Sequence, residues 1–295
     1  MANLKEVRNR ITSVSSTQQI TSAMKMVSAA KLRRAQDAIT RLRPYAQKLR
    51  EVLEEVTAGA EIVDNKFSII REENNILIIV VTSNRGLCGG FNNNVIRLTQ
   101  RHVQQNYASQ FAKSNVHLIT VGKKGNDMLA KQFKVVNNSS HFLNKIEFHE
   151  VGGLAQWVMD AFSKGTYDKV EIVYNQFKNA AVQFSVIEQF LPVVSETLHT
   201  TDVNPKTTRK DYVFAPSKVE IIEDIIPKTL KTQFYKAVLD SNASEHGARM
   251  TSMQKATDNA SDLLKELKIS YNKARQAIIT NEILEIVGGA EALDN

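Results

Sequence analysis

One turn in the sequence has residue types that could bind a phosphate group. It follows a predicted strand, opens a predicted helix and reads Asn84-Arg85-Gly86-Leu87-Cys88-Gly89-Gly90-Phe91-Asn92. Backbone N–H groups at such a helix start often hold phosphates. However, its glycines lack the G-x-G-x-x-G spacing, and no Gly-Lys-Ser/Thr ends it as in a Walker A loop. Two interpretations remain: a phosphate-binding turn, or a tight turn with Cys88 as a small buried residue.

Other residue types that often carry chemistry show no recognisable arrangement. The six histidines lack H-E-x-x-H or another metal-ligand spacing, and no G-x-S-x-G motif marks a nucleophile. Cys88 is the only cysteine, which excludes an internal disulfide framework and any multi-cysteine zinc or iron–sulfur site. The sequence therefore predicts no catalytic residue, no metal and no cofactor.

The net charge of +7 is concentrated at the N-terminus. Residues 1–50 contain 11 Lys or Arg and 2 acidic residues, so the rest of the chain is nearly neutral. Such a segment either meets an acidic partner (nucleic acid, a lipid surface or an acidic protein) or is a solvated helix face. No apolar run approaches the roughly 18 residues that span a bilayer, and the N-terminus lacks the apolar core of a signal peptide.

The spacing of apolar residues in the first 60 residues predicts a coiled-coil helix. From residue 4 to residue 56 a strict 3,4 alternation marks sixteen positions, of which twelve are apolar. The four exceptions are consecutive: Gln18, Thr21, Lys25 and Ser28. Apolar residues there occupy a neighbouring face (Ile20, Ala23, Met24, Val27 and Ala30), so we expect the contact face to rotate around the helix and return. Pro44 should kink or break the helix near Arg43.

A second coiled-coil helix is predicted at the C-terminus. The 3,4 series from 243 to 278 is apolar at nine of eleven positions, and we expect one helix from about Pro227 to Val287, ended by Gly288-Gly289. Antiparallel pairing with Val56 opposite about Ser217 would place Leu4 opposite about Ile269. The stretch at about 270–287 would then have no partner within the chain although it is apolar, so it would need an external sleeve.

The middle of the chain alternates between predicted strands and helices. Strands are expected at 76–81, 116–121, 169–174 and 182–187, helices at about 92–106, 124–132 and 151–163, and a polar loop at 195–211. The β-α-β order implies a mostly parallel sheet. The predicted fold class is α/β: a long antiparallel coiled coil of the N- and C-terminal helices plus a central Rossmann-like α/β domain. The expected segments are 1–60, 70–210 and 211–295.

Three stretches together resemble the gamma subunit of the F-type ATP synthase, in a bacterial-like form. They are ITSVSSTQQITSAMKMV at 11–27 with AAKLRR at 29–34; RGLCGGFN at 85–92; and SEHGARM at 244–250, followed by ATDNA at 256–260, YNKARQA at 271–277, ITNEI at 279–283 and EIVGG at 285–289. The middle, about 125–210, is generic. Asn84 departs from the Asp expected in many relatives, which weakens a charge-based role for this turn.

The resemblance implies a rotating central stalk that itself binds no nucleotide or other cofactor and is not catalytic. It implies that the apolar tip sits in a bearing of alpha and beta subunits. The basic helix would face an acidic loop of the beta subunits, and the α/β domain would be a foot beside the epsilon subunit and the c-ring. Proton flow would turn ring and foot together and so drive ATP release. One copy per complex would lie, without a transmembrane segment, at the cytoplasmic face of the bacterial inner membrane.

Residue roles also carry over by resemblance, one position at a time. Positions of the N-terminal helix near the acidic loops match Met24, Lys25, Arg33 and Arg34. C-terminal positions that hydrogen-bond the beta subunits high in the bearing match Arg249, Gln276, Thr280 and Glu282. The turn of the foot is matched by Arg85, Gly86, Cys88, Gly89 and Gly90.

Two other classes of function remain open from the residues alone. One is a nucleotide-dependent Rossmann-like enzyme with coiled-coil arms. The other is a nucleic-acid binder that uses the basic N-terminal segment. Tyr45 is the only aromatic residue in residues 1–50, which argues against the second class because single-stranded nucleic acids stack on aromatic side chains.

Overall fold

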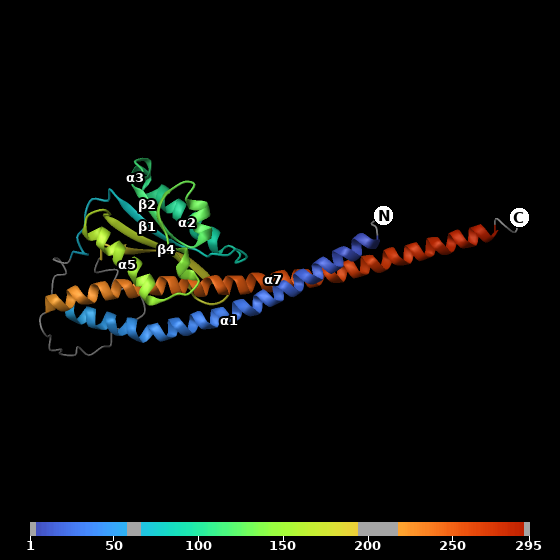
Figure 1. Ribbon diagram of the computed structural model, residues 1–295, viewed down its shortest axis with the longest axis horizontal. Coiled ribbons are helices and arrows are strands. Elements are labelled where there is room, and N and C mark those ends of the chain that lie inside the picture. Colours follow the sequence, from blue (N-terminus) through green and yellow to red (C-terminus); the bar gives the residue numbers. More distant parts are fainter. Residues whose placement is uncertain (1–3, 58–65, 194–217, 292–295) are drawn as a thin grey trace. The chain divides into compact units, whose positions relative to one another are not determined.

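The computed structural model describes residues 4–57, 66–193 and 218–291 (Figure 1). The chain divides into two compact units, one of residues 1–28 with 249–295 and one of residues 29–248. The long helices at the two ends, α1 (Leu4–Thr57) and α7 (Lys218–Glu291), each contribute to both units. The predicted loop at 195–211 lies outside the described residues.

The second unit is built on a five-stranded sheet with the strand order β3-β2-β1-β4-β5. Its parallel strands are β1 (Ile76–Val81), β2 (Val116–Val121), β3 (Lys134–Asn138) and β4 (Lys169–Phe177), and β5 (Gln183–Leu191) is antiparallel to β4. The predicted mostly parallel sheet is therefore confirmed. The sequence analysis missed β3, because this edge strand is largely exposed and polar and lacks the apolar run of a buried strand.

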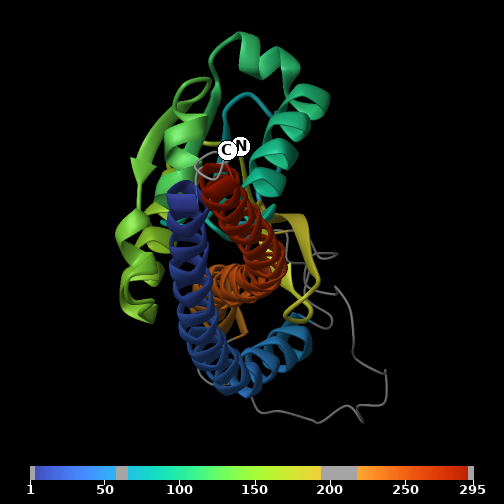
Figure 2. The same cartoon turned by 90° about the vertical axis from the view of Figure 1, so that its right-hand side faces the viewer.

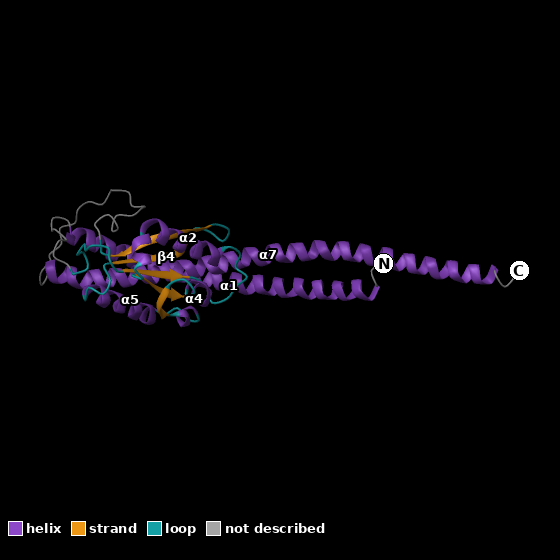
Figure 3. Cartoon of the chain, turned by 90° about the horizontal axis from the view of Figure 1, so that it is seen from above, coloured by secondary structure: helices purple, strands orange, loops and turns teal. Residues whose placement is uncertain are grey.

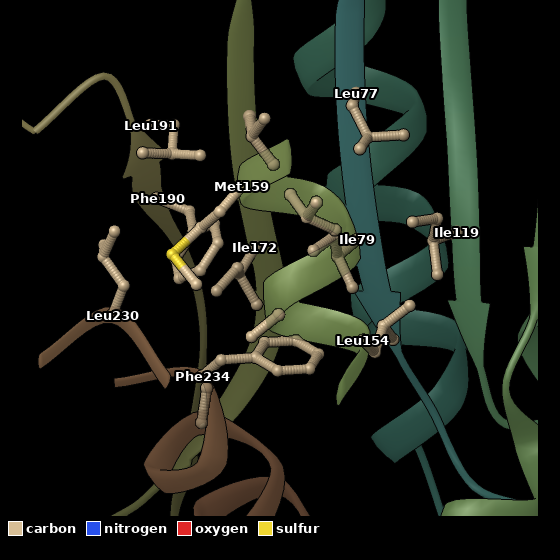
Figure 4. Packing of buried hydrophobic residues seen from close by; sticks show 14 of the residues in the cluster. Leu77, Ile79, Ile119, Leu154, Met159, Ile172, Phe190, Leu191, Leu230 and Phe234 are labelled. Atoms are coloured by element: carbon tan, nitrogen blue, oxygen red, sulfur yellow. The ribbon is translucent and has the colours of Figure 1, made fainter. Parts of the chain in front are cut away.

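Helices cover both faces of the sheet. One apolar core lies between the sheet and α2 (Phe91–Asn106) with α4 (Lys123–Leu129). The other lies between the sheet, α5 (Phe148–Ser163) and residues 226–238 of α7. In Figure 4, Leu230 and Phe234 of α7 lie near Phe190 and Ile172 of the sheet. Two short helices, α3 (Ala108–Ala112) and the 3-10 helix η2 (Ser140–Leu143), complete the unit.

In the first unit, α1 and α7 run side by side and antiparallel, as the sequence predicts (Figure 3). The register is defined by a hydrogen bond of 2.8 Å between the hydroxyls of Thr21 and Thr257. If this register is followed along the pair, Leu4 lies opposite Ala274 and not Ile269, so the predicted register was wrong by five residues, or nearly one and a half helical turns. The side chain of Val56 and all of Ser217, on which that prediction relied, lie outside the described residues.

The contact face of α1 does not rotate around the helix, contrary to our prediction. Thr21 and Ser28 are only 8% and 3% exposed, whereas Ile20 and Val27 are 60% and 57% exposed. Burial is possible because both hydroxyls have partners: Thr21 bonds Thr257, and Ser28 Oγ donates to the Met24 carbonyl at 2.7 Å. The 3,4 seam therefore continues through its polar positions, and the apolar residues around Val27 form a second face that points outward.

Of the two outcomes expected at Pro44, a kink or a break, the break does not occur, and Gly288-Gly289 does not end α7 as predicted. Figure 2 shows α1 as one continuous ribbon, and its bounds include Pro44. Likewise α7 begins before Pro227 and continues through Gly288-Gly289. A proline removes one backbone hydrogen bond, and packing can outweigh this loss: Ile226, beside Pro227, is buried in the core. No helix in the described part of the chain has a stretch long and apolar enough to cross a membrane.

Candidate functional site: the helix tip, the neck and the foot turn

The C-terminal end of α7, which we call the tip, exposes large apolar side chains. Six of them are 39% to 71% exposed: Ile278, Ile279, Ile283, Leu284, Ile286 and Val287. At 3.6 residues per turn, these side chains are spread over about two thirds of the helix circumference. A groove covers only one side of a helix. The distribution therefore suits a partner that surrounds the tip, and the exposed apolar end itself is as the sequence predicts.

Three of the candidate residues lie at the tip and are exposed: Gln276, Thr280 and Glu282. Gln276 and Thr280 lie one turn apart on the same face, and Thr280 Oγ1 donates to the Gln276 carbonyl at 2.9 Å. Glu282 lies about 160° around the helix from Thr280. The three side chains therefore cannot all contact one flat partner surface, whereas a surrounding partner can contact all of them.

The fourth C-terminal candidate, Arg249, is separated from the tip. It precedes Gln276 by 27 residues on α7, which is about 40 Å along the helix axis. Its side chain is buried. The register of the helix pair places Lys25 opposite Met253, one turn from Arg249. The structure therefore places Arg249 near the level of Lys25 along the helix pair. The resemblance had grouped Arg249 with the tip residues Gln276, Thr280 and Glu282.

The N-terminal candidates, which we call the neck residues, are Met24, Lys25, Arg33 and Arg34 of α1. Met24 and Lys25 are half-buried, while Arg33 and Arg34 are exposed. Within the described ranges, neither Arg33 nor Arg34 forms an ion pair. Two exposed guanidinium groups without an acidic partner in the described chain suit an acidic surface on another molecule.

The turn after β1, residues 84–92, is closed by its own hydrogen bonds. Asn92 accepts the backbone N–H of Ser83 at 2.9 Å, and its side-chain amide donates to Cys88 Sγ at 3.3 Å. Cys88 is buried, as the tight-turn interpretation requires. Leu87 and Gly89 both adopt positive φ, 63° and 58°, which reverses the chain within a few residues. This foot turn is therefore a tight strand-to-helix connection.

A small cavity lies beside the foot turn. Its volume is about 200 Å³, and its lining includes Leu87, Asn93, Ile96, Lys124 and Met128. Pockets for cofactors and other small ligands usually measure about 300–1,000 Å³ and converge several polar groups on the ligand. The polar side chains that line this cavity are Asn92, Asn93 and Lys124, beside the thiol of Cys88. In the described part of the chain, no cluster of His, Cys, Asp or Glu could hold a metal ion.

Asn84, the departure from the expected pattern, uses both ends of its amide group. Its Nδ2 donates to the Ser140 carbonyl at 2.9 Å, and its Oδ1 accepts the backbone N–H of Lys123 at 3.1 Å. It thereby ties the end of β1 to the segments that follow β2 and β3. Nothing in the local sequence pattern indicates these two partners.

Sequence reasoning also missed a buried carboxylate network on the α2 face of the sheet. Glu171 of β4 accepts the hydroxyl of Tyr107 at 2.8 Å and pairs with His102 Nε2 at 2.6 Å. Lys169 lies over the Tyr107 ring. Burial, and then the Glu171 carboxylate, raise the pKa of Tyr107 well above its ordinary value. Tyr107 and His102 provide hydrogen-bond partners for the buried Glu171 carboxylate, so the network has a structural role.

The sequence matches a known family over nearly its whole length. A family model described as ATP synthase matches residues 3–293. The chain is 55% identical over 294 residues to the ATP synthase gamma chain of Flavobacterium psychrophilum, covering 99% of both chains. It is 54% identical over 295 residues to that of Flavobacterium johnsoniae, covering 100% of both.

Solved structures show the same fold. A chain of the Euglena gracilis mitochondrial ATP synthase, in a structure of OSCP, F1 and c-ring, superposes with a TM-score of 0.69 at 24% identity, covering 98% of this chain and 94% of that one. A chain of the central stalk and c-ring of the Tetrahymena thermophila mitochondrial ATP synthase gives 0.57 at 26% identity, covering 80% and 99%. The first of these two similarities covers nearly the whole chain and therefore includes both long helices and the sheet.

Proposed function

The chain belongs to the ATP synthase gamma chain family, and from this premise we propose how its surfaces serve a rotor. It is a non-catalytic central-stalk subunit of an F-type ATP synthase, which couples ion flow through the c-ring to ATP synthesis by the catalytic subunits. The observation that carries this function is the 55% identity over 99% of the chain and of its relative. The segments 1–60, 70–210 and 211–295 serve as N-terminal shaft helix, foot and C-terminal shaft helix.

The tip of α7 turns inside a bearing formed by alpha and beta subunits. Support comes from the exposed apolar side chains around about two thirds of the helix, which a surrounding partner would cover. Gln276 and Thr280 contact one beta subunit while Glu282 contacts another, because these side chains lie on different faces. As the shaft turns, each face meets each beta subunit in turn.

The neck residues face acidic loops of the beta subunits. The exposure of Arg33 and Arg34 supports this role. The outward apolar face around Val27 supports an additional apolar contact of α1 with a partner protein. Arg249 belongs to the same level of the shaft as Lys25, and it positions the neck from the buried side of α7. Weak surface ion pairs, worth about 0–1 kcal/mol each, suit a rotor that must break every contact at each step.

The foot lies beside the epsilon subunit and the c-ring, and the foot turn with Arg85, Gly86, Cys88, Gly89 and Gly90 is part of that surface. The subunit is peripheral to the membrane, with one copy per complex, at the cytoplasmic face of a bacterial inner membrane. Leu87 and Met128, both exposed beside this turn, support a protein contact there. The small cavity does not support the alternative of a nucleotide-binding enzyme. The alternative of nucleic-acid binding is not needed to explain the basic helix, because acidic loops of the beta subunits would pair with its charges.

The bearing is tested by making the tip polar. Replacement of Ile283, Leu284, Ile286 and Val287 by Ser should weaken incorporation of the chain into the complex and lower ATP-driven charge movement into membrane vesicles. A voltage-sensitive dye reports this movement whichever ion is carried. The matched control replaces Ile69 and Ile70, which are also exposed but lie outside the tip, by Ser. A tip variant that assembles and pumps like wild type would contradict the bearing.

A further inference from the structure

The helix α7 lies against the hairpin of β4 and β5 through directed contacts as well as apolar packing. Gln233 Nε2 donates to Glu188 Oε1 of β5 at 2.7 Å, and Ser244 Oγ donates to the Asn175 carbonyl of β4 at 3.0 Å. Because residues 233, 240, 244 and 247 share one face of a helix, these contacts run along a single line of α7. All of them lie within the unit of residues 29–248.

Gly247 lets the turn of this hairpin touch the backbone of α7. A Cβ atom at this position would lie 3.1 Å from the Ala180 carbonyl oxygen and 3.2 Å from the Ala180 Cα. A glycine inside a helix costs about 0.5–1 kcal/mol relative to alanine, so its place here needs a reason. The reason is the close approach of residue 180, which lies in the connection between the two strands.

Asn175 links the same line of contacts to the foot turn. Its carbonyl accepts Ser244, its Nδ2 donates to the Phe91 carbonyl at 3.0 Å, and its Oδ1 accepts Ser185 Oγ at 2.6 Å. Phe91 is the first residue of α2 and directly follows Gly90 of the foot turn. A buried series of hydrogen bonds therefore runs from the foot turn through β4 to α7.

The polar contacts do something that the apolar packing cannot. Leu230 and Phe234 hold α7 on the sheet (Figure 4), but apolar contact has no preferred direction, and a helix can roll or slide on such a surface. Hydrogen bonds depend on distance and angle. Bonds at Gln233 and Ser244, with the hairpin turn seated on Gly247, fix both the rotation and the position of α7.

We propose that the β4–β5 hairpin is the joint that transmits torque between foot and shaft, with Ser244 and Gly247 as positioning residues. The proposal rests on the rotor function above. A shaft helix that rolls on the foot would let the foot stay behind while the shaft turns. ATP would then be hydrolysed without ion transport, although the chain remains folded and bound.

The experiment compares two pairs of variants in the complete complex, reconstituted into vesicles. The test variant combines Ser244→Ala with Gly247→Ala. The control combines Ser241→Ala with Gly153→Ala: Ser241 is a buried serine on α7 whose hydroxyl has no hydrogen-bond partner among the described residues, and a Cβ at Gly153 would meet nothing within 4 Å. ATP hydrolysis and ATP-driven charge movement are measured on the same vesicles, and thermal unfolding of each chain is recorded.

The test variant should keep its ATP hydrolysis while charge movement per ATP falls by about threefold or more. The control should keep the wild-type ratio. A test variant with the wild-type charge movement per ATP would contradict the proposed role of the hairpin. An equal loss of hydrolysis and transport in test and control would contradict it as well. Should the double variant not assemble, Ser244→Ala alone removes one oxygen atom and decides the question by the same ratio. Absence of ATP-driven charge movement with the wild-type chain would instead overturn the rotor function.

Discussion

At Gly122 the backbone conformation permits only glycine. Its φ is +125°, and a Cβ there would lie 2.5 Å from the Thr82 carbonyl oxygen. Gly122→Ala should lower the free energy of unfolding by about 2 kcal/mol or more, because strain and a clash combine. Gly86→Ala is the matched control, since its Cβ would meet nothing within 4 Å, and it should change stability by less than about 0.5 kcal/mol. Urea unfolding of both variants checks this, and similar losses would contradict it.

Asp240 makes stability depend on pH in an unusual direction. Burial, and secondarily Glu188, raise the pKa of this carboxyl from 3.8 to about 6, while Lys236 and Arg43 oppose the rise. The folded chain therefore keeps a proton that the unfolded chain has lost between about pH 4 and 6. This contribution to stability falls as the pH rises through that range and then stays constant.

The variant Asp240→Asn should therefore be more stable than wild type at pH 7.5, by on the order of 1–3 kcal/mol. The difference should shrink as the pH falls from about 6 to about 4, because wild-type Asp240 is then protonated and neutral in both states. Urea unfolding at four pH values measures it. A difference between the two chains that does not vary with pH would show that folding does not raise the pKa of Asp240.

At the scale of the elements, the polar seam of the helix pair makes a prediction about Thr21 and Thr257. Their hydroxyls lie 2.8 Å apart, and one must donate to the other. Thr21→Val alone should lower stability by about 1 kcal/mol, because Thr257 loses its bond across the seam and keeps only the bond that it donates to the Met253 carbonyl within α7 at 2.8 Å. Thr21→Val with Thr257→Val should recover most of this loss. Thermal unfolding of wild type, the two single variants and the double variant gives a complete double-mutant cycle. Simple addition of the two single losses would show that the seam bond contributes nothing.

At the scale of the whole molecule, the exposed neck charges should affect coupling more than folding. Arg34→Glu replaces an exposed charge and should change stability by only about 0.5 kcal/mol. It should lower charge movement per ATP in the assembled complex, since it replaces attraction to acidic loops by repulsion. Salt should weaken the effect, because screening shortens the reach of exposed charges.

The control for this prediction is Arg101→Glu, which changes the same charge on the exposed side of α2. Both chains should unfold at nearly the wild-type temperature. Full coupling with Arg34→Glu, or an equal loss with Arg101→Glu, would show that Arg34 does not face the acidic loops.

The sequence alone determined the class of the fold, the family and the bounds of two buried strands, whereas β4 and β5 extend three and four residues beyond their predicted ends. β1 and β2 begin and end where the largely apolar segments at 76–81 and 116–121 predict, because a strand buried on both faces is apolar at most of its positions. The exposed tip could also be predicted, since it follows from the lengths of the two helices. The strand bounds depend on the residues of one segment, and the tip depends on the lengths of two segments, and both can be read from the sequence.

Only the tertiary structure decided which polar residues are buried and what they contact. Thr21 occupies the helix seam because it meets Thr257, 236 residues away in the sequence, and Ser244 anchors α7 through Asn175, 69 residues away. A pattern of apolar residues treats such positions as failures, so it predicted a rotating contact face that does not exist. The physical reason is that burial of a hydroxyl costs free energy unless a partner accepts or donates its hydrogen bond. For Thr21 and Ser244 that partner comes from another segment, and its distance is set by the fold.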